Sequence, residues 1–175
     1  PLLEALKDKN PEVRAGAAYV LGEIADKNSL SALISAVKDE NVEVRRAAVY
    51  ALGKIGNERA VVSLILTLKD EDEGVRYGAK EALVRAGQPA IAPLLWALKN
   101  REEEVRIGAA EILGRIGDKR AVPDLILALK SEKAVVRARA AEALGRINDK
   151  SSVLSLISAL KDRDSDVRYW AAFSL

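Results

Sequence analysis

Apolar residues recur along the chain at spacings of three and four positions, in short segments separated by polar stretches. In segment 121–130, for example, Val122, Leu125, Ile126 and Leu129 fall on one side of a helix. This spacing predicts amphipathic helices that bury one face. Two types alternate, which we call helix A and helix B. We expect helix A at residues 1–7, 29–38, 60–69, 89–99, 121–130 and 151–161, and helix B at residues 11–25, 42–55, 73–86, 103–116, 134–147 and 165–175.

A Val-Arg pair stands near the start of each helix B and returns at a nearly constant interval. The six pairs are Val13-Arg14, Val44-Arg45, Val75-Arg76, Val105-Arg106, Val136-Arg137 and Val167-Arg168, with steps of 31, 31, 30, 31 and 31 residues. A period of this size is typical of a repeat array, in which each unit packs only on its neighbours. We therefore expect one all-α solenoid domain over residues 1–175. Its predicted repeats are about 1–26, 27–57, 58–87, 88–118, 119–149 and 150–175.

The residues around the pair carry a family resemblance. Val-Arg is followed by Ala-Ala and then by Leu-Gly-x-Ile-Gly-Asp-x-Arg-Ala-Val-x-x-Leu, which resembles the HEAT repeats of the phycobilisome-lyase type over essentially the whole chain. The resemblance implies a right-handed α-solenoid of HEAT-like repeats. Pro1 aligns with Pro93 inside helix A, and Leu175 precedes the expected Gly-x-Ile-Gly, so both terminal repeats are expected to be truncated. Because such repeats occur in scaffolds, adaptors and a few enzymes, they predict fold better than function.

Glycines mark two places in helix B. Gly56, Gly87 and Gly117 end three of the helices, and Asn148 ends a fourth, which favours a left-handed cap. A second set, inside the helix, comprises Gly22, Gly53, Gly114 and Gly145. Glycine there costs about 1 kcal/mol relative to alanine, so we expect close approach of a neighbouring helix backbone. Repeat three has Val84 instead and is one residue shorter, which predicts a local change of superhelical twist.

Composition removes several kinds of chemistry. The chain has no His and no Cys, and its 28 basic and 26 acidic residues give a net charge of +2. Without these residue types, the commonest general base, thiolate nucleophile and metal ligand are missing. We therefore expect no metal, no cofactor and no enzymatic activity. The balanced charge argues against nucleic acid or an anionic membrane as partner, and no signal peptide is visible, so the expected location is the cytoplasm.

The resemblance also raises enzymes as an alternative. Deoxyhypusine hydroxylase is a HEAT-type enzyme that holds iron through His-Glu motifs, which a chain without His does not contain. An enzyme or enzyme subunit of the bilin-lyase kind is the alternative function, although no residue here matches a lyase-specific site. A nucleic-acid binder ranks third. Lys54, Arg85, Arg115 and Arg146 form a basic row, but three of them have a Glu four residues earlier.

The arginines of the Val-Arg pairs form the first candidate cluster. Six residues before them stand, in order, Asp8, Asp39, Asp70, Asn100, Ser131 and Asp162. This is similar to the HEAT-family ladder, in which the turn Asp bonds the Arg of helix B. The expected structural pairs are Arg14 with Asp8, Arg45 with Asp39, Arg76 with Asp70, and Arg168 with Asp162. Arg106 and Arg137 face Asn100 and Ser131 and are expected to lack a charged partner, so either could bind an anion if it is free.

Aromatic residues single out one face of helix B. Positions two, three and six after the Val hold six of the seven aromatics of the chain. Tyr, Trp and Arg dominate the hot spots of protein interfaces. In HEAT arrays the B helices line the concave side, so we expect a groove there for a protein or peptide partner. Its predicted residues are Tyr19, Arg46, Tyr50, Tyr77 and Glu81, with Tyr169, Trp170 and Phe173 as a second cluster. Alternatively, the tyrosines only pack between B helices.

Helix A carries a second pattern. Just before its last Ala-Leu or equivalent, the outer repeats have a polar residue, whereas the middle repeats have Leu66, Trp96 and Leu127. These side chains either form an exposed apolar stripe or fill gaps between neighbouring A helices. Taken together, the sequence predicts a non-enzymatic scaffold or adaptor that binds another protein or a peptide.

Overall fold

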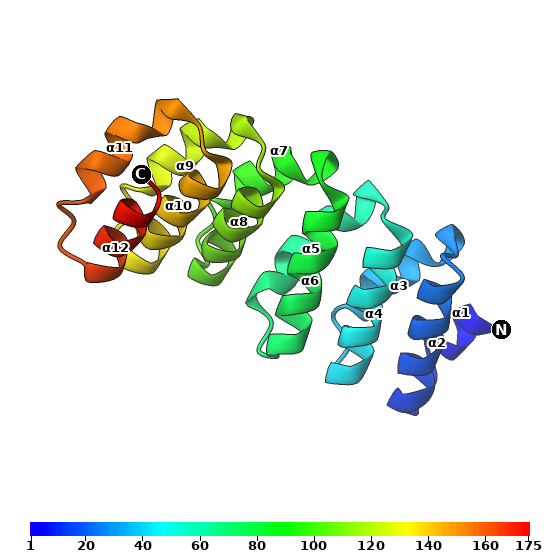
Figure 1. Cartoon of the computed structure of the whole chain (residues 1–175). Coiled ribbons are helices and arrows are strands. Elements are labelled where there is room, and N and C mark those ends of the chain that lie inside the picture. The colour runs from blue at the N-terminus through cyan, green and yellow to red at the C-terminus, as the bar shows by residue number, and fades with distance from the viewer. The chain divides into compact units, whose positions relative to one another are not determined.

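The computed structural model describes all 175 residues, which form twelve α-helices in two alternating types (Figure 1). Helix A of the repeats corresponds to α1 (Leu2–Ala5), α3 (Leu30–Ala36), α5 (Val61–Leu66), α7 (Gln88–Ala97), α9 (Val122–Ala128) and α11 (Val153–Ala159). Helix B corresponds to α2 (Pro11–Glu23), α4 (Val42–Ile55), α6 (Glu73–Ala86), α8 (Glu103–Ile116), α10 (Ala134–Ile147) and α12 (Ser165–Phe173). The predicted all-α solenoid of two-helix repeats is confirmed. No helix combines the length and the apolar character that crossing a membrane requires.

The ends of helix B follow from side-chain and backbone capping. Asn10 and Asn41 accept hydrogen bonds from backbone N–H groups of the first turns of α2 and α4, which satisfies donors that have no partner within the helix. The predicted left-handed cap is found at Gly56, Gly117 and Asn148. Gly87 also has a positive φ of 62°, but its ψ of −123° lies outside the left-handed helical region, so that part of the prediction is wrong.

Most A helices are shorter than predicted at both ends. Each α-helix ends two or three residues early, and a 3₁₀ turn replaces the first one or two predicted residues. Such turns are η1 (Lys27–Ser29), η2 (Glu58–Ala60), η4 (Lys119–Ala121) and η5 (Lys150–Ser152). The Asp or Asn side chain before each turn accepts a backbone N–H of that turn. In the shorter third-to-fourth junction, α7 starts directly at Gln88 without such a turn.

The helices form two compact units, Pro1–Ala90 and Ile91–Leu175. In the first unit, α4 packs against both α2 and α6; in the second, α10 packs against both α8 and α12. Leucines at one common position of helix B, including Leu52 in the first unit and Leu113 in the second, are almost completely buried. The expectation of one continuous solenoid domain stays a prediction.

The glycines inside helix B explain how closely the B helices pack. A Cβ atom at Gly22 would lie 2.6 Å from the Cα of Ala51, and one at Gly114 would lie 2.7 Å from the Cα of Ala143. Neither distance is sterically possible, so glycine is required for the approach of α2 to α4 and of α8 to α10. This confirms the predicted reason for these glycines. The change of twist predicted near Val84 stays a prediction.

Candidate partner-binding site

Two tyrosines from successive repeats stack on the exposed face of α2 and α4. The ring centroids of Tyr19 and Tyr50 are 5.3 Å apart, and the ring planes differ by 11°. Both stand six residues after the Val of their repeats, so the repeat register places them side by side. The side chains are exposed, Tyr19 at 51% and Tyr50 at 39%. The pair therefore contacts its own neighbour and still offers ring surface to a partner.

A charged edge borders this pair. The Tyr50 hydroxyl donates a hydrogen bond to the Glu23 carboxylate, and the Lys54 Nζ lies 3.4 Å from the same carboxylate. The Tyr50 hydrogen bond lowers the pKa of Glu23 and raises the pKa of Tyr50. The pKa of Lys54 is raised, first by Tyr50 and then by Glu23. Glu23 and Lys54 both stand ten residues after a Val, so the sequence register could have revealed this contact.

Arg46 joins the second repeat to the third. Its Nε and Nη2 donate to the Asp72 carboxylate at 2.9 and 2.6 Å, and its Nη1 donates to Glu43 at 2.9 Å. Asp72 also caps α6 by accepting the N–H of Val75 at 2.9 Å. The Arg46 guanidinium, followed by this backbone bond, lowers the pKa of Asp72 to about 2. The guanidinium is thus held by carboxylates, and about half of the side chain remains exposed.

Two hollows meet at Arg46 and Tyr50. One, of about 440 Å³, lies between α2 and α4 and is lined by Gly16, Tyr19, Arg46 and Tyr50 among others. The other, of about 330 Å³, lies between α4 and α6; it adds Tyr77, with Glu81 and Arg85 at its side. A Cβ atom at Gly16 would meet nothing within 4 Å, so this backbone is open to an incoming chain. The structure thus brings the five predicted residues of the first unit together. We call this surface the tyrosine groove.

The second predicted aromatic cluster lies on α12. The Tyr169 ring meets the Trp170 ring edge-on at 5.3 Å, and Phe173 lies 6.2 Å from Tyr169. Tyr169 and Phe173 are exposed, at 59% and 72%. These three aromatic side chains therefore contact one another. They belong to the second compact unit, whereas the tyrosine groove belongs to the first.

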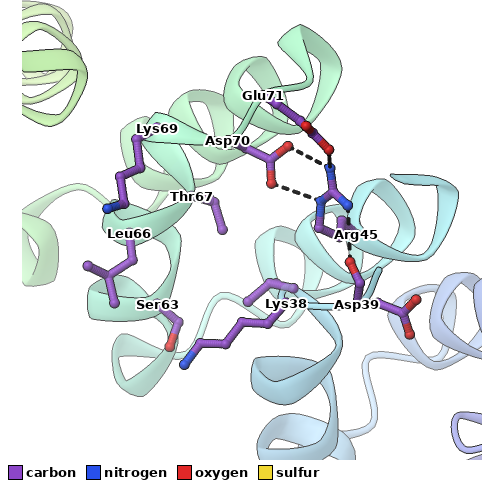
Figure 2. A pocket seen from close by; sticks show the side chains of 10 residues that line it. Lys38, Asp39, Arg45, Ser63, Leu66, Thr67, Lys69, Asp70 and Glu71 are labelled. Atoms are coloured by element: carbon purple, nitrogen blue, oxygen red, sulfur yellow. Dashed lines mark hydrogen bonds and ion pairs between the residues drawn. The ribbon is translucent and has the colours of Figure 1, made fainter. Parts of the chain in front are cut away.

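The arginine ladder exists, but its register differs from the prediction. Arg45 donates through Nη1 to the backbone carbonyls of Asp39 and Glu40, at 3.0 and 3.1 Å. Its Nε and Nη2 donate to the carboxylate of Asp70 in the following repeat, at 2.9 and 3.0 Å (Figure 2). Within its own repeat the arginine therefore binds the turn backbone, and the carboxylate that it binds comes from the next turn. The predicted pairing of Arg45 with the Asp39 carboxylate is wrong for this reason.

The same register holds in two other repeats. Arg14 binds the Asp39 carboxylate and the Asp8 carbonyl, while Arg137 binds the Asp162 carboxylate at 2.7 Å. The prediction that Arg137 lacks a charged partner is therefore wrong. Arg76 and Arg168 bind the backbone carbonyls of Asp70 and Asp162 and not the carboxylates predicted for them. Arg14, Arg45 and Arg137 are buried, whereas Arg76 is half-buried and Arg168 is exposed.

The second predicted surface consists of exposed side chains. Leu66 is 43% exposed, Trp96 65% and Leu127 57%. These values do not support the alternative in which the three side chains fill gaps between A helices. Leu66 belongs to the first compact unit, and Trp96 and Leu127 belong to the second, so their alignment into one stripe stays a prediction.

Stacked helix pairs, close glycine contacts and Arg–Asp bonds from one repeat to the next define an α-solenoid repeat protein. Matches to HEAT repeats at residues 1–84, 62–132 and 91–175 together span the whole chain, and the protein belongs to the HEAT-repeat family. No protein of curated function matches its sequence.

Solved structures share the fold. The complex of CpcE and CpcF of phycocyanin lyase from Nostoc sp. PCC7120 is 26% identical, with 99% of this chain and 74% of that chain covered and a TM-score of 0.54. Human deoxyhypusine hydroxylase is 23% identical, with 99% and 81% covered and a TM-score of 0.53. A designed armadillo repeat protein in complex with the peptide (KR)4 is 18% identical, with 99% and 96% covered and a TM-score of 0.55.

Proposed function

We propose that this protein is a non-enzymatic scaffold that binds a protein or peptide through the tyrosine groove. The observation that carries the proposal is the meeting of two hollows at Arg46 and Tyr50, with the rings of Tyr19, Tyr50 and Tyr77 exposed around them. Large aromatic side chains that stand exposed in a preformed hollow have the properties of interface hot spots, because little conformational entropy is lost when they are covered.

The contacts within the groove add to its fitness for binding. Stacking holds Tyr19 against Tyr50, the Glu23 hydrogen bond fixes the Tyr50 hydroxyl, and Asp72 fixes Arg46. A partner would meet side chains that are already ordered, which reduces the cost of association. The open backbone at Gly16 would allow a main chain to approach closely. The charged groups of the groove are paired with one another, Lys54 with Glu23 and Arg46 with Glu43 and Asp72. The fitting partner is therefore a peptide with apolar or aromatic anchors and mixed charge, not a highly charged polymer.

The test is a peptide-display selection against the full chain, followed by affinity measurement on the enriched peptides. We expect Tyr50→Ala combined with Tyr77→Ala to weaken binding by at least about 2 kcal/mol, the loss typical of a hot spot. Leu154→Ala is the matched control, because Leu154 is 81% exposed on α11 and lies outside the groove. Circular dichroism should show unchanged helicity in both variants. Equal affinity of the double variant and the native chain would place the binding site elsewhere.

A further inference from the structure

Three ladder arginines, Arg14, Arg45 and Arg137, bind a carboxylate of the following turn. Arg106 bonds only to backbone carbonyls, as Arg76 and Arg168 do. In the fifth turn, Ser131 stands where Asp39, Asp70 and Asp162 receive the arginine of the preceding repeat. Arg106 still donates through Nη1 to the carbonyls of Asn100 and Arg101, both at 2.8 Å. These two bonds match those of Arg45 to Asp39 and Glu40. The guanidinium is therefore held at the same corner, while its Nε and Nη2 bond to no protein group.

Arg106 belongs to the lining of a hollow in the second compact unit. Its volume is about 230 Å³, and its lining includes Leu98, Arg106, Leu127, Lys130 and Ser131. This hollow is the equivalent, two repeats later, of the hollow at Arg45 that Figure 2 shows. Each lining residue stands 61 positions after a lining residue of the Arg45 hollow, except Val136, which stands 61 positions after Val75 on α6. In the Arg45 hollow the Asp70 carboxylate accepts the hydrogen bonds of Nε and Nη2 of the guanidinium. In the Arg106 hollow the shorter, neutral Ser131 side chain makes no hydrogen bond to the guanidinium. Its hydroxyl instead accepts a hydrogen bond from the Lys133 N–H at 3.3 Å.

The remaining charges of the hollow favour an anion. Asp124 is the acidic residue in the lining, and it is paired with Lys99 at 2.9 Å. Lys130 is exposed and forms no ion pair. Glu132 follows Ser131 as Glu71 follows Asp70, but it makes no ion pair with Arg106, whereas Glu71 lies 3.1 Å from Arg45. The hollow thus combines two cations that have no anionic partner with apolar side chains.

The geometry points to Arg106 as a binding site for a carboxylate of a partner polypeptide, either an acidic side chain or a C-terminus. The planar carboxylate fits the parallel Nε and Nη2 donors, as three internal aspartates show within the same fold. Leu98 and Leu127 would contact apolar residues beside that carboxylate. This site lies in the second compact unit and does not depend on the tyrosine groove, so either can fail without the other.

The test follows the arginine Nε–Hε resonances of the ¹⁵N-labelled full chain by NMR. The Arg106 resonance is assigned as the one that Arg106→Lys removes. The probe is an acetylated, amidated pentapeptide with a central aspartate between apolar residues. We expect this peptide to move the Arg106 resonance saturably and its asparagine counterpart to bind at least about tenfold more weakly, since the charge-assisted bonds are lost. The asparagine peptide with a free C-terminus distinguishes the two sources of carboxylate, and saturable binding of it supports the C-terminal source.

Ser131→Asp is the decisive variant, because it should place the missing carboxylate on Arg106 from within and abolish peptide binding. Ser35→Asp, which adds the same charge to an exposed position of α3 in the first compact unit, should bind the peptide as the native chain does. An Arg106 resonance that does not respond to the aspartate peptide, or a Ser131→Asp variant that binds as tightly as the native chain, would overturn the inference. The inference also fails if Glu132 occupies the site in the native chain. In that case Glu132→Gln would shift the Arg106 resonance without any peptide, and only this variant would bind the aspartate peptide.

Discussion

The carboxylate of Asp39 accepts two hydrogen bonds, each 2.8 Å long, from the guanidinium of Arg14, which lies 25 residues earlier. The same carboxylate accepts the backbone N–H of Asn41 at 2.9 Å and so shapes its own turn. One side chain therefore both forms the turn of its repeat and fastens that turn to the preceding repeat. In a solenoid, where stability depends on interfaces between neighbours, such a contact couples the folding of adjacent repeats.

The ladder predicts a large effect of Arg45→Ala on stability. Arg45 is 7% exposed and binds Asp70 from the next turn, so its removal leaves a nearly buried carboxylate without a counter-ion. We expect the free energy of unfolding to fall by about 3 kcal/mol in urea melts. Arg106→Ala is the matched control, since it removes only two hydrogen bonds to carbonyls and should cost about 1 kcal/mol. Equal losses in the two variants would show that the carboxylate bond contributes nothing.

Ser131→Asp predicts a gain in stability. The new carboxylate would complete the ladder at Arg106, which is already held by Asn100 and Arg101, so little entropy remains to be lost. We expect the free energy of unfolding to rise by about 1 kcal/mol. Ser131→Asn serves as the control, because it caps the turn as Asn100 does and brings no charge. A Ser131→Asp variant no more stable than Ser131→Asn would contradict the prediction.

Two glycines of α2 predict opposite effects of the same substitution. Gly22→Ala would place a Cβ 2.6 Å from the Ala51 backbone, whereas Gly16→Ala meets nothing within 4 Å. Gly22→Ala should therefore destabilise the protein by about 1–3 kcal/mol through overpacking. Gly16→Ala should stabilise it by about 0.5–1 kcal/mol, the helix preference of alanine over glycine. Thermal melts of the two variants test this directly, and stabilisation by both would disprove the close approach of α2 to α4.

Asp72 predicts loss of stability in acid. Because its pKa is lowered from 3.8 to about 2, first by Arg46, folding favours the ionised form. Its contribution is complete above pH 3.8 and is lost as the pH falls toward 2. Asp72→Asn should make the free energy of unfolding decline less steeply over this pH range. Arg46→Gln should have a similar but smaller effect, because Arg46 is the main cause of the lowered pKa of Asp72. Asp149 also has a pKa of about 2, chiefly because of its hydrogen bond with Ser151. Its protonation should therefore still lower the free energy of unfolding in both variants, so part of the decline remains. Unchanged slopes would contradict the Arg46–Asp72 interaction.

Trp96 predicts a solvent-exposed fluorescence signal. Trp170→Phe leaves Trp96 as the single indole of the chain, and Trp96 is 65% exposed. We expect its emission at the wavelength of an indole in water, with efficient quenching by acrylamide. A blue-shifted, quencher-protected signal from a proven monomer would show that Trp96 is covered, and the predicted second surface would then be excluded.

The sequence by itself determined the repeat, the helix types and much of the tyrosine groove. Helix B is bounded by local signals, such as Asn41 before α4 and Gly56 after it, so its ends could be predicted within a few residues. A constant period aligns equal positions of successive helices, which is why the sequence alone predicts that Tyr19 and Tyr50 cluster, as their stacked rings do.

Only the tertiary structure decided which carboxylate each ladder arginine binds. The resemblance to the HEAT-family ladder implied the Asp six residues earlier, but helix B carries the guanidinium beyond its own turn. There the guanidinium donates through Nη1 to the backbone carbonyls of its own turn, and through Nε and Nη2 to the carboxylate of the next turn. The choice depends on the distance between stacked repeats, which glycine contacts such as Gly22 with Ala51 set. For the same reason, Ser131 leaves Arg106, and not Arg137, without a carboxylate.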